Sequence, residues 1–216
     1  MDELDKLKGV WKTQDYSKHK ISTTDIYKML HAKSSSYVKW IFYISIAELS
    51  LGLLINIISY FNGSLDESTK LIKETGYYNY FIVATYLSTG VVIYFIYKFY
   101  QMFKRIEVSD NTKTLMNTIL NTRKIVKQYI NFNLIFAFII IESVLVFGII
   151  KEYSKIAIAK GLPAEIPLKV YILGGLAAIV IGVILVGVFW LIYHILYGIL
   201  LKRLKKNYKE LAQLDN

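Results

Sequence analysis

The sequence contains no cysteine, only two prolines and only three histidines. Without cysteine the chain has no disulfide framework, no thiol nucleophile and no thiolate metal site. The histidines His19, His31 and His194 lie in three separate segments and form no metal-binding motif. No phosphate-binding glycine loop and no nucleophile elbow is present either. We therefore expect a protein without catalysis, metal or cofactor.

What the sequence has instead is long apolar blocks. Of its 216 residues 55% are hydrophobic, and they gather in four runs rather than in short amphipathic periods. Apolar runs of about 18 residues or more are typical of transmembrane helices. The predicted spans are residues 38–61, 77–96, 132–150 and 170–197. The fold class is thus an all-α polytopic membrane protein embedded in a lipid bilayer.

The charges predict how the chain is oriented in the membrane. Of 26 Lys and Arg residues, 20 fall before or at the start of the first span, between the second and third spans, or after the fourth, and six fall in the other two connections. This bias is the positive-inside signature, so both termini are predicted to be cytoplasmic. The net charge of +10 then reflects topology rather than nucleic-acid binding. Only three of the basic residues are Arg, and Lys, Ile, Tyr and Asn are abundant, which suits a bacterial inner membrane.

Three regions follow from this layout. Residues 1–35 form a charged cytoplasmic segment without the features of a signal peptide, residues 36–202 the four-helix membrane domain, and residues 203–216 a cytoplasmic helical tail. The first segment places an apolar face at helical spacing outside the bilayer, where it could dock on a partner helix or groove. Its residues are Leu4, Leu7, Val10 and Trp11.

Two heptad seams adjoin the third and fourth spans. Each repeats at steps of three or four residues and predicts that these helices extend into the cytoplasm and pack on each other there. The alternative is an amphipathic stretch lying on the lipid surface. The seams are Leu115, Ile119, Thr122, Val126 and Tyr129, and Tyr197, Leu201, Leu204, Tyr208 and Leu211.

Glu48 and Glu142 stand inside apolar runs. VKWIFYISIAE, which ends at Glu48, aligns without gaps on FNLIFAFIIIE, which ends at Glu142. This alignment is a weak sign of a duplicated hairpin, and it predicts that the two carboxyls lie at one depth near the middle of the bilayer. The high cost of a charge there favours protonated, hydrogen-bonded side chains inside the bundle.

A polar stripe accompanies Glu48 on the first span. Ser45, Glu48, Gly52, Asn56 and Ser59 share one face of the helix. We expect this face to meet other helices or water, with Thr85, Ser88 and Thr89 of the second span as partners. Glu48 and Glu142 are then either neutral structural hydrogen-bonding groups, at about 0.6 kcal/mol per pair, or a proton or cation site.

On the fourth span, Gly174, Ala178 and Gly182 form a ridge of small residues. Such a ridge lets another helix approach closely, either within the bundle or between two copies in a homodimer.

The opening MDELDKLKGVWK, followed by DIYKML, SSS and VKWIF, resembles a group of small uncharacterised four-span bacterial inner-membrane proteins. Some of these have an automatic label of β-carotene monooxygenase. Carotenoid oxygenases and diiron membrane hydroxylases hold iron with more histidines than the three in this chain, so the resemblance implies a membrane location but no activity.

These observations favour a non-catalytic membrane tether, regulator or accessory subunit that binds a protein partner through its cytoplasmic segments. The alternative is a small proton-coupled transporter or channel that uses Glu48 and Glu142.

Overall fold

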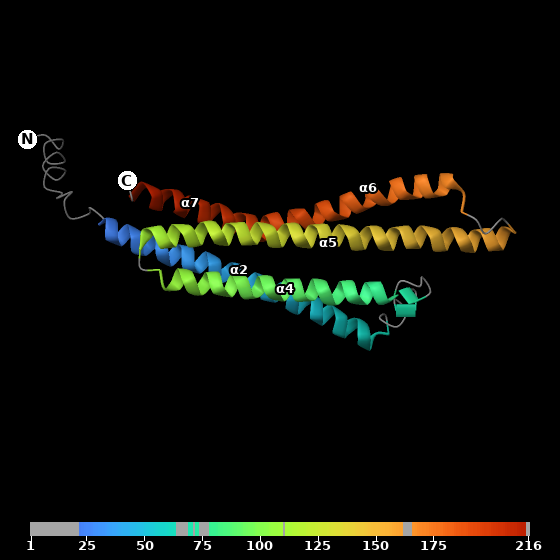
Figure 1. Cartoon of the computed structure of the whole chain (residues 1–216), viewed down its shortest axis with the longest axis horizontal. Helices are drawn as coiled ribbons and strands as arrows, with labels where there is room; N and C mark the ends of the chain where they lie inside the picture. Colours follow the sequence, from blue (N-terminus) through green and yellow to red (C-terminus); the bar gives the residue numbers. More distant parts are fainter. Residues whose placement is uncertain are drawn as a thin grey trace, which may run out of the picture.

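A computed structural model describes residues 22–63, 69–70, 72–73, 78–109, 111–161 and 166–214. The protein is all-α, and Figure 1 shows its long helices running side by side. The elements are α2 (Thr23–Phe61), α4 (Tyr78–Glu107), α5 (Thr112–Lys160), α6 (Leu168–Tyr193), the short π-helix η2 (His194–Gly198) and α7 (Ile199–Leu214). The N-terminal face of Leu4, Leu7, Val10 and Trp11 lies outside the described residues.

The helix ends follow local sequence chemistry. Ser22 begins α2 by accepting a hydrogen bond from the Thr24 backbone N–H at 3.3 Å, and Asn111 caps α5 by accepting from Thr114 N–H at 2.7 Å. Gly161, at φ 62°, ends α5 in the left-handed conformation that glycine tolerates. The third predicted span ends at residue 150, but the helix that contains it does not end there. KEYSKIAIAK contains no helix breaker, so α5 continues to Lys160.

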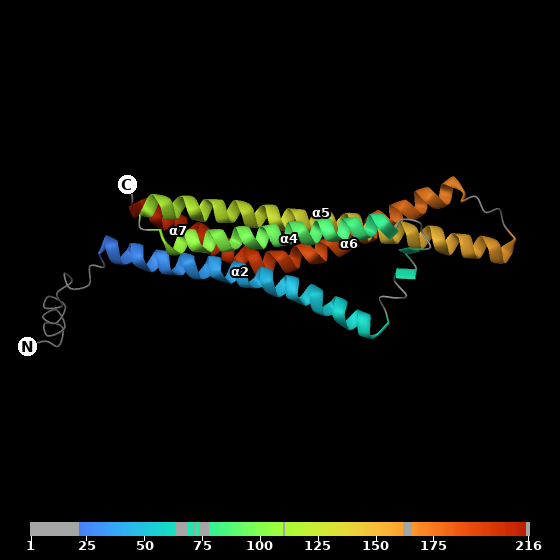
Figure 2. The ribbon, with the colours of Figure 1, turned by 60° about the horizontal axis from the view of Figure 1, so that its bottom comes forward.

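The helices form an elongated bundle with two distinct ends. At one end, called here the termini end, α2 and α5 begin and α4 and α7 finish. At the other, the loop end, α2 and α5 finish and α4 and α6 begin. In Figures 1 and 2, α2 lies beside α4 and α7 near the termini end and diverges from α6 toward the loop end. The protein is therefore closely packed over only part of its length.

The hydrophobic core lies in the half of the bundle at the termini end. It joins α2, α4, α5 and α7 and includes all five residues of the first predicted seam. Tyr197, Leu204 and Leu211 of the second seam are also buried, with Leu201 and Tyr208 packed at its edge. The predicted packing of the segments next to the third and fourth spans on each other is thus observed. The remaining core side chains are Leu30, Val38, Ile41, Phe99, Met102 and Ile106.

Polar contacts also tie the helices together at the termini end. Buried Asn207 of α7 donates from its Nδ2 to Ser34 Oγ of α2 at 2.9 Å. Tyr27 donates to the Ser109 carbonyl at 2.9 Å, and His31 Nε2 lies 2.6 Å from the Ile106 carbonyl. These bonds join α2 to the end of α4 and to α7, so they fix the start of α2 relative to its neighbours.

The half toward the loop end exposes its apolar side chains. Along α6 most large hydrophobic residues are about half exposed, as expected for helices surrounded by lipid. Four helical segments, Thr23–Phe61, Tyr78–Glu107, Thr112–Lys160 and Leu168–Gln213, are long and apolar enough to cross a bilayer. The chain is therefore a multi-pass membrane protein with four candidate spans.

The small-residue ridge of α6 packs within the chain. A Cβ at Gly174 would lie 2.9 Å from Ile149 Cγ2 of α5, and Ala178 is buried. Gly182 also meets α5, at Glu142. These three small residues let α6 and α5 approach closely, which is the within-bundle alternative of the sequence analysis.

Candidate functional site

Glu48 of α2 accepts hydrogen bonds from three tyrosines. Tyr129 of α5 donates to Glu48 Oε2 at 2.7 Å, and Tyr197 of η2 donates to the same oxygen at 3.3 Å. Tyr193, the last residue of α6, donates to Oε1. The carboxyl group thus joins α2 to α5 and to the junction of α6 with η2, and we call these four residues the Glu48 cluster.

The three tyrosines are held by their own packing. Tyr129 and Tyr197 are fully buried, and Tyr129 makes edge contacts with Phe95 and Phe99 of α4 at ring distances of 5.5 and 5.4 Å. Tyr193 and Tyr197 lie four residues apart, so their rings share one face of the helix at 5.9 Å. Such tightly packed rings place their hydroxyls at a fixed position.

The π-helix η2 stands where the fourth span changes its packing face. Buried positions on α6 are Ala178 and Gly182, which face α5. Beyond η2 they are Leu204, Asn207 and Leu211 of α7, and the two leucines enter the core shared with α2. A π-turn changes the angular phase of a helix, and such turns are frequent at functional sites. Here the turn begins directly after Tyr193 and contains Tyr197.

The Glu48 cluster contains no positive charge. In all three hydrogen bonds a tyrosine hydroxyl donates and a Glu48 carboxyl oxygen accepts. An ionised carboxylate can accept all three, because it has acceptor positions and no donor. Within the described part of the chain, no Lys, Arg or His forms an ion pair with Glu48; the ion pairs there are the surface pairs Lys155–Glu152 and Lys206–Glu210. Among the described residues, the Glu48 carboxyl is therefore held by hydrogen bonds and not by an ion pair.

A cavity of about 230 Å³ opens beside Glu48, between α2 and α4. The polar stripe of α2 forms one side of it through Glu48, Gly52 and Asn56, and Thr89 of α4 adds a further polar group. Ser45 stands apart from this cavity, because it is buried and donates to the carbonyl of Phe42 at 2.7 Å. The apolar part of the wall comes from Leu49, Leu53 and Val92, with Tyr129 between cavity and cluster.

The prediction that hydroxyl groups of the second span are the hydrogen-bond partners of Glu48 is wrong. Thr85 donates to the Phe81 carbonyl, and Ser88 and Thr89 both donate to the Thr85 carbonyl of their own helix. The sequence analysis placed Tyr129 and Tyr197 on the two seams but did not assign them to Glu48. The missed signal was that Tyr129 and Tyr197 lie on the predicted seams, because a tyrosine on an internal face needs a partner for its hydroxyl.

Glu142 does not lie at the level of Glu48. Glu48 bonds to Tyr129, which precedes Glu142 by 13 residues on α5, a distance of about 20 Å along the helix. The expectation that the Glu48 and Glu142 carboxyls lie at the same depth is therefore wrong. In the bundle, α2 and α5 do not place side by side the residues that the gapless alignment pairs. Tyr129 also precedes the apolar run that begins at Phe132, so Glu48 lies at the edge of that run and not at its middle.

Glu142 instead fills a space made by Gly182. Its Oε1 lies so close to α6 that a Cβ at Gly182 would overlap it, and this oxygen is buried without a hydrogen-bond partner among the described residues. Glu142 and Glu48 are thus two separate sites, one unpaired and one with three donors.

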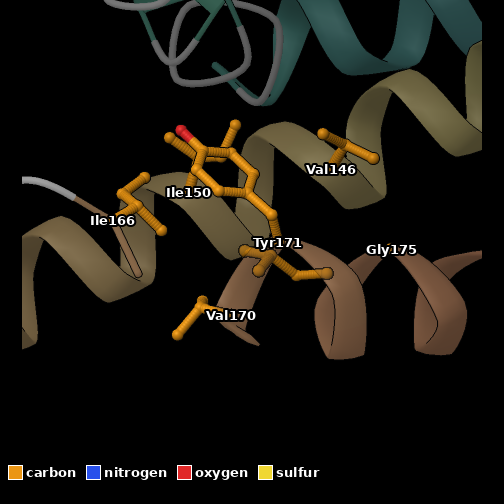
Figure 3. Close-up of a pocket in the computed structure, with 7 residues that line it drawn as sticks. Val146, Ile150, Ile166, Val170, Tyr171 and Gly175 are labelled. Carbon is orange, nitrogen blue, oxygen red and sulfur yellow. The ribbon is translucent and has the colours of Figure 1, made fainter. Parts of the chain in front are cut away.

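Two further cavities lack a comparable group. Figure 3 shows one near the loop end, where the side chains of α5 and α6 around it are apolar except for the Tyr171 hydroxyl; its volume is about 100 Å³. The other, of about 280 Å³, lies between α5 and η2 and includes Lys127, Asn131 and His194. The ring of His194 stacks on Trp190 there. Neither cavity contains a carboxylate.

Comparison with known proteins gives one family. A family model described as a domain of unknown function (DUF8845) matches residues 24–216, most of the chain. No curated protein and no solved structure matches it. The matched range includes the Glu48 cluster and begins after the apolar N-terminal face.

Proposed function

The chain belongs to the DUF8845 family, whose description names no activity, and we propose that it is a non-catalytic tether or accessory subunit of a bacterial inner membrane. In this proposal the termini end is cytoplasmic and presents a rigid helical bundle, with the N-terminal segment beside it, to a protein partner. The polar groups of the Glu48 cluster serve to hold α2, α5 and the α6–η2 junction together.

The observation that supports this function is the position of the core. The buried side chains gather at the termini end, which is the end that the positive-inside bias assigns to the cytoplasm. A bundle that served only as a membrane anchor would not need α5 and α7 to extend beyond the membrane and pack on each other there. A rigid extension with a basic outer surface suits an acidic protein partner, since α7 exposes Lys202, Arg203, Lys205, Lys206 and Lys209.

Orientation is tested with topology reporters. Fusions after Asp110 and after Asn216 are expected to report cytoplasm, and a fusion at Ser64 periplasm. A periplasmic signal at Asp110 would contradict the proposed orientation, because the charge bias is its support.

Partner binding is tested by deletion and co-purification. Removing residues 1–16 is expected to leave insertion and thermal stability unchanged, because these residues precede all four candidate spans, while the co-purified partner is lost from gentle-detergent preparations. The Lys202→Gln/Lys209→Gln pair keeps the N-terminal segment and alters the basic surface of α7, so it tests the other part of the proposed docking surface and is expected to weaken co-purification. If the deletion leaves the set of co-purified proteins unchanged, the N-terminal segment is not the docking element.

A second candidate function is a small proton-coupled transporter or channel. The observation that favours it is the cavity beside Glu48. Because Glu142 lies about 20 Å farther along α5, the two carboxylates would act as separate sites. Glu48→Gln keeps the size of the side chain but cannot exchange a proton, so it is expected to abolish a pH-dependent flux in proteoliposomes if this function holds. An unchanged flux would exclude Glu48 from coupling.

A further inference from the structure

Glu48 has acceptor capacity that the three tyrosines do not use. A carboxylate offers about four lone-pair positions, two on each oxygen. Oε2 receives Tyr129 and Tyr197, whereas Oε1 receives only Tyr193. One acceptor position on Oε1 is therefore left, and Glu48 is one of the residues that form the wall of the cavity between α2 and α4.

The other polar groups of this cavity offer acceptor positions as well. Asn56 donates from Nδ2 to the Gly52 carbonyl at 2.8 Å, which leaves its amide oxygen as an acceptor and one N–H as a donor. Thr89 donates its hydroxyl proton to the Thr85 carbonyl at 2.9 Å, which leaves its lone pairs. The Tyr129 proton is used on Glu48. Acceptor positions therefore predominate around the Glu48 carboxyl, and such a wall suits a cation that donates hydrogen bonds.

The dimensions of the cavity favour an organic cation over a metal ion. Glu48 and Asn56 are eight residues apart, about 12 Å along the helix, whereas oxygen ligands stand about 2.0–2.6 Å from a hard metal ion. One ion therefore cannot contact both. Between them Leu49, Leu53 and Val92 form an apolar wall. At about 230 Å³ the cavity is smaller than the pockets of about 300 Å³ or more that hold drug-sized ligands.

We propose that the cavity between α2 and α4 binds a small primary ammonium ion, which donates to the Glu48 carboxyl and lays a short apolar group along Leu49, Leu53 and Val92. The site lies at the edge of the apolar run of α5, so a charged amine reaches Glu48 without crossing the hydrocarbon core. This inference does not depend on the tether function.

The test measures binding of phenethylammonium to the full chain in lipid nanodiscs by calorimetry, with empty nanodiscs as the blank. We expect saturable binding of one ion per chain. The neutral analogue 2-phenylethanol, which has the same ring and chain length, is expected to bind at least about tenfold more weakly because it cannot neutralise Glu48. Glu48→Gln is expected to remove this preference for the cation.

A cavity-filling variant keeps the test independent of the Glu48 cluster. Gly52 forms part of the cavity wall and has no atom within 4 Å of an added Cβ, so Gly52→Leu adds a side chain beside the cavity and leaves Glu48 and the tyrosines in the sequence. It is expected to abolish binding. Gly90→Leu is the matched control, because Gly90 has equal free space on α4 but does not form part of this cavity.

Three results would overturn the proposal: binding that does not saturate, equal affinity for the alcohol, or equal binding by Gly52→Leu and the unmodified chain. Loss of binding to the same extent in Gly90→Leu and Gly52→Leu would place the site elsewhere.

Discussion

Replacing Glu48 with leucine is expected to destabilise the bundle well beyond the loss of one hydrogen bond. The substitution removes the acceptor of three hydroxyls, of which Tyr129 and Tyr197 are fully buried. Polar pairs in a membrane protein average about 0.6 kcal/mol and reach about 1.7 kcal/mol, so three bonds give about 2 kcal/mol at the average and about 5 at the maximum. We expect Glu48→Leu to lower the free energy of unfolding by about 2 kcal/mol or more.

A double-mutant cycle tests the physical reason. Tyr129→Phe alone removes one donor and leaves Glu48 with two, so it is expected to cost about 0.6–1.7 kcal/mol. In the Glu48→Leu background the same change removes a hydroxyl that already lacks its acceptor, so its cost is expected to fall to about zero. The coupling between the two sites should therefore approach the full cost of Tyr129→Phe.

The assay is reversible unfolding in mixed micelles with increasing SDS, followed by circular dichroism. Ser143→Ala serves as the control, because the Ser143 hydroxyl is bonded to the Ile139 carbonyl of its own helix and joins no second element. If Glu48→Leu is as stable as the control, or if Tyr129→Phe costs the same in both backgrounds, the hydroxyls do not depend on Glu48 and the reasoning is refuted.

Gly182→Ala is expected to cost about 1 kcal/mol in the same unfolding assay, because its Cβ displaces the Glu142 carboxyl. Glu142→Ala in the same chain should remove this cost. In the control Gly187→Ala the added Cβ meets open space, so the protein should not be destabilised. Asn207→Ala is expected to cost about 1–3 kcal/mol, because it leaves the buried Ser34 hydroxyl without its partner on α7; equal stability of this variant and the unmodified chain would contradict the assignment.

The architecture could be predicted from the sequence because each span is long and uniformly apolar. The seams were predictable for the same reason, since a period of three and four residues needs no knowledge of the neighbouring helix. The extension of α5 to Lys160 was not predicted, because Lys151 and Glu152 mark the end of an apolar run but do not end a helix. The end of α5 is set by Gly161.

The partners of Glu48 could not be predicted because they depend on register between helices. The gapless alignment of the first and third spans paired Glu48 with Glu142, but α2 enters the bundle about 20 Å out of that register. The apolar residues Val38 and Ile41 before Glu48 belong to the protein core, not to the lipid-facing surface. Hydropathy does not distinguish these two environments, so it could not give the register of α2 against α5.

The offset of α2 explains why Glu48 stands where it does. Toward the termini end, Val38, Ile41 and Ser45 are buried against the other helices. Toward the loop end, the residues after Leu49 are largely exposed, and Asn56 bonds only within α2. The Glu48 cluster is thus the last link from α2 to α5 and the α6–η2 junction among the hydrogen bonds of the described residues. Because α2 diverges beyond that link, removing it should free the outer half of α2 while the core of α4, α5 and α7 stays intact.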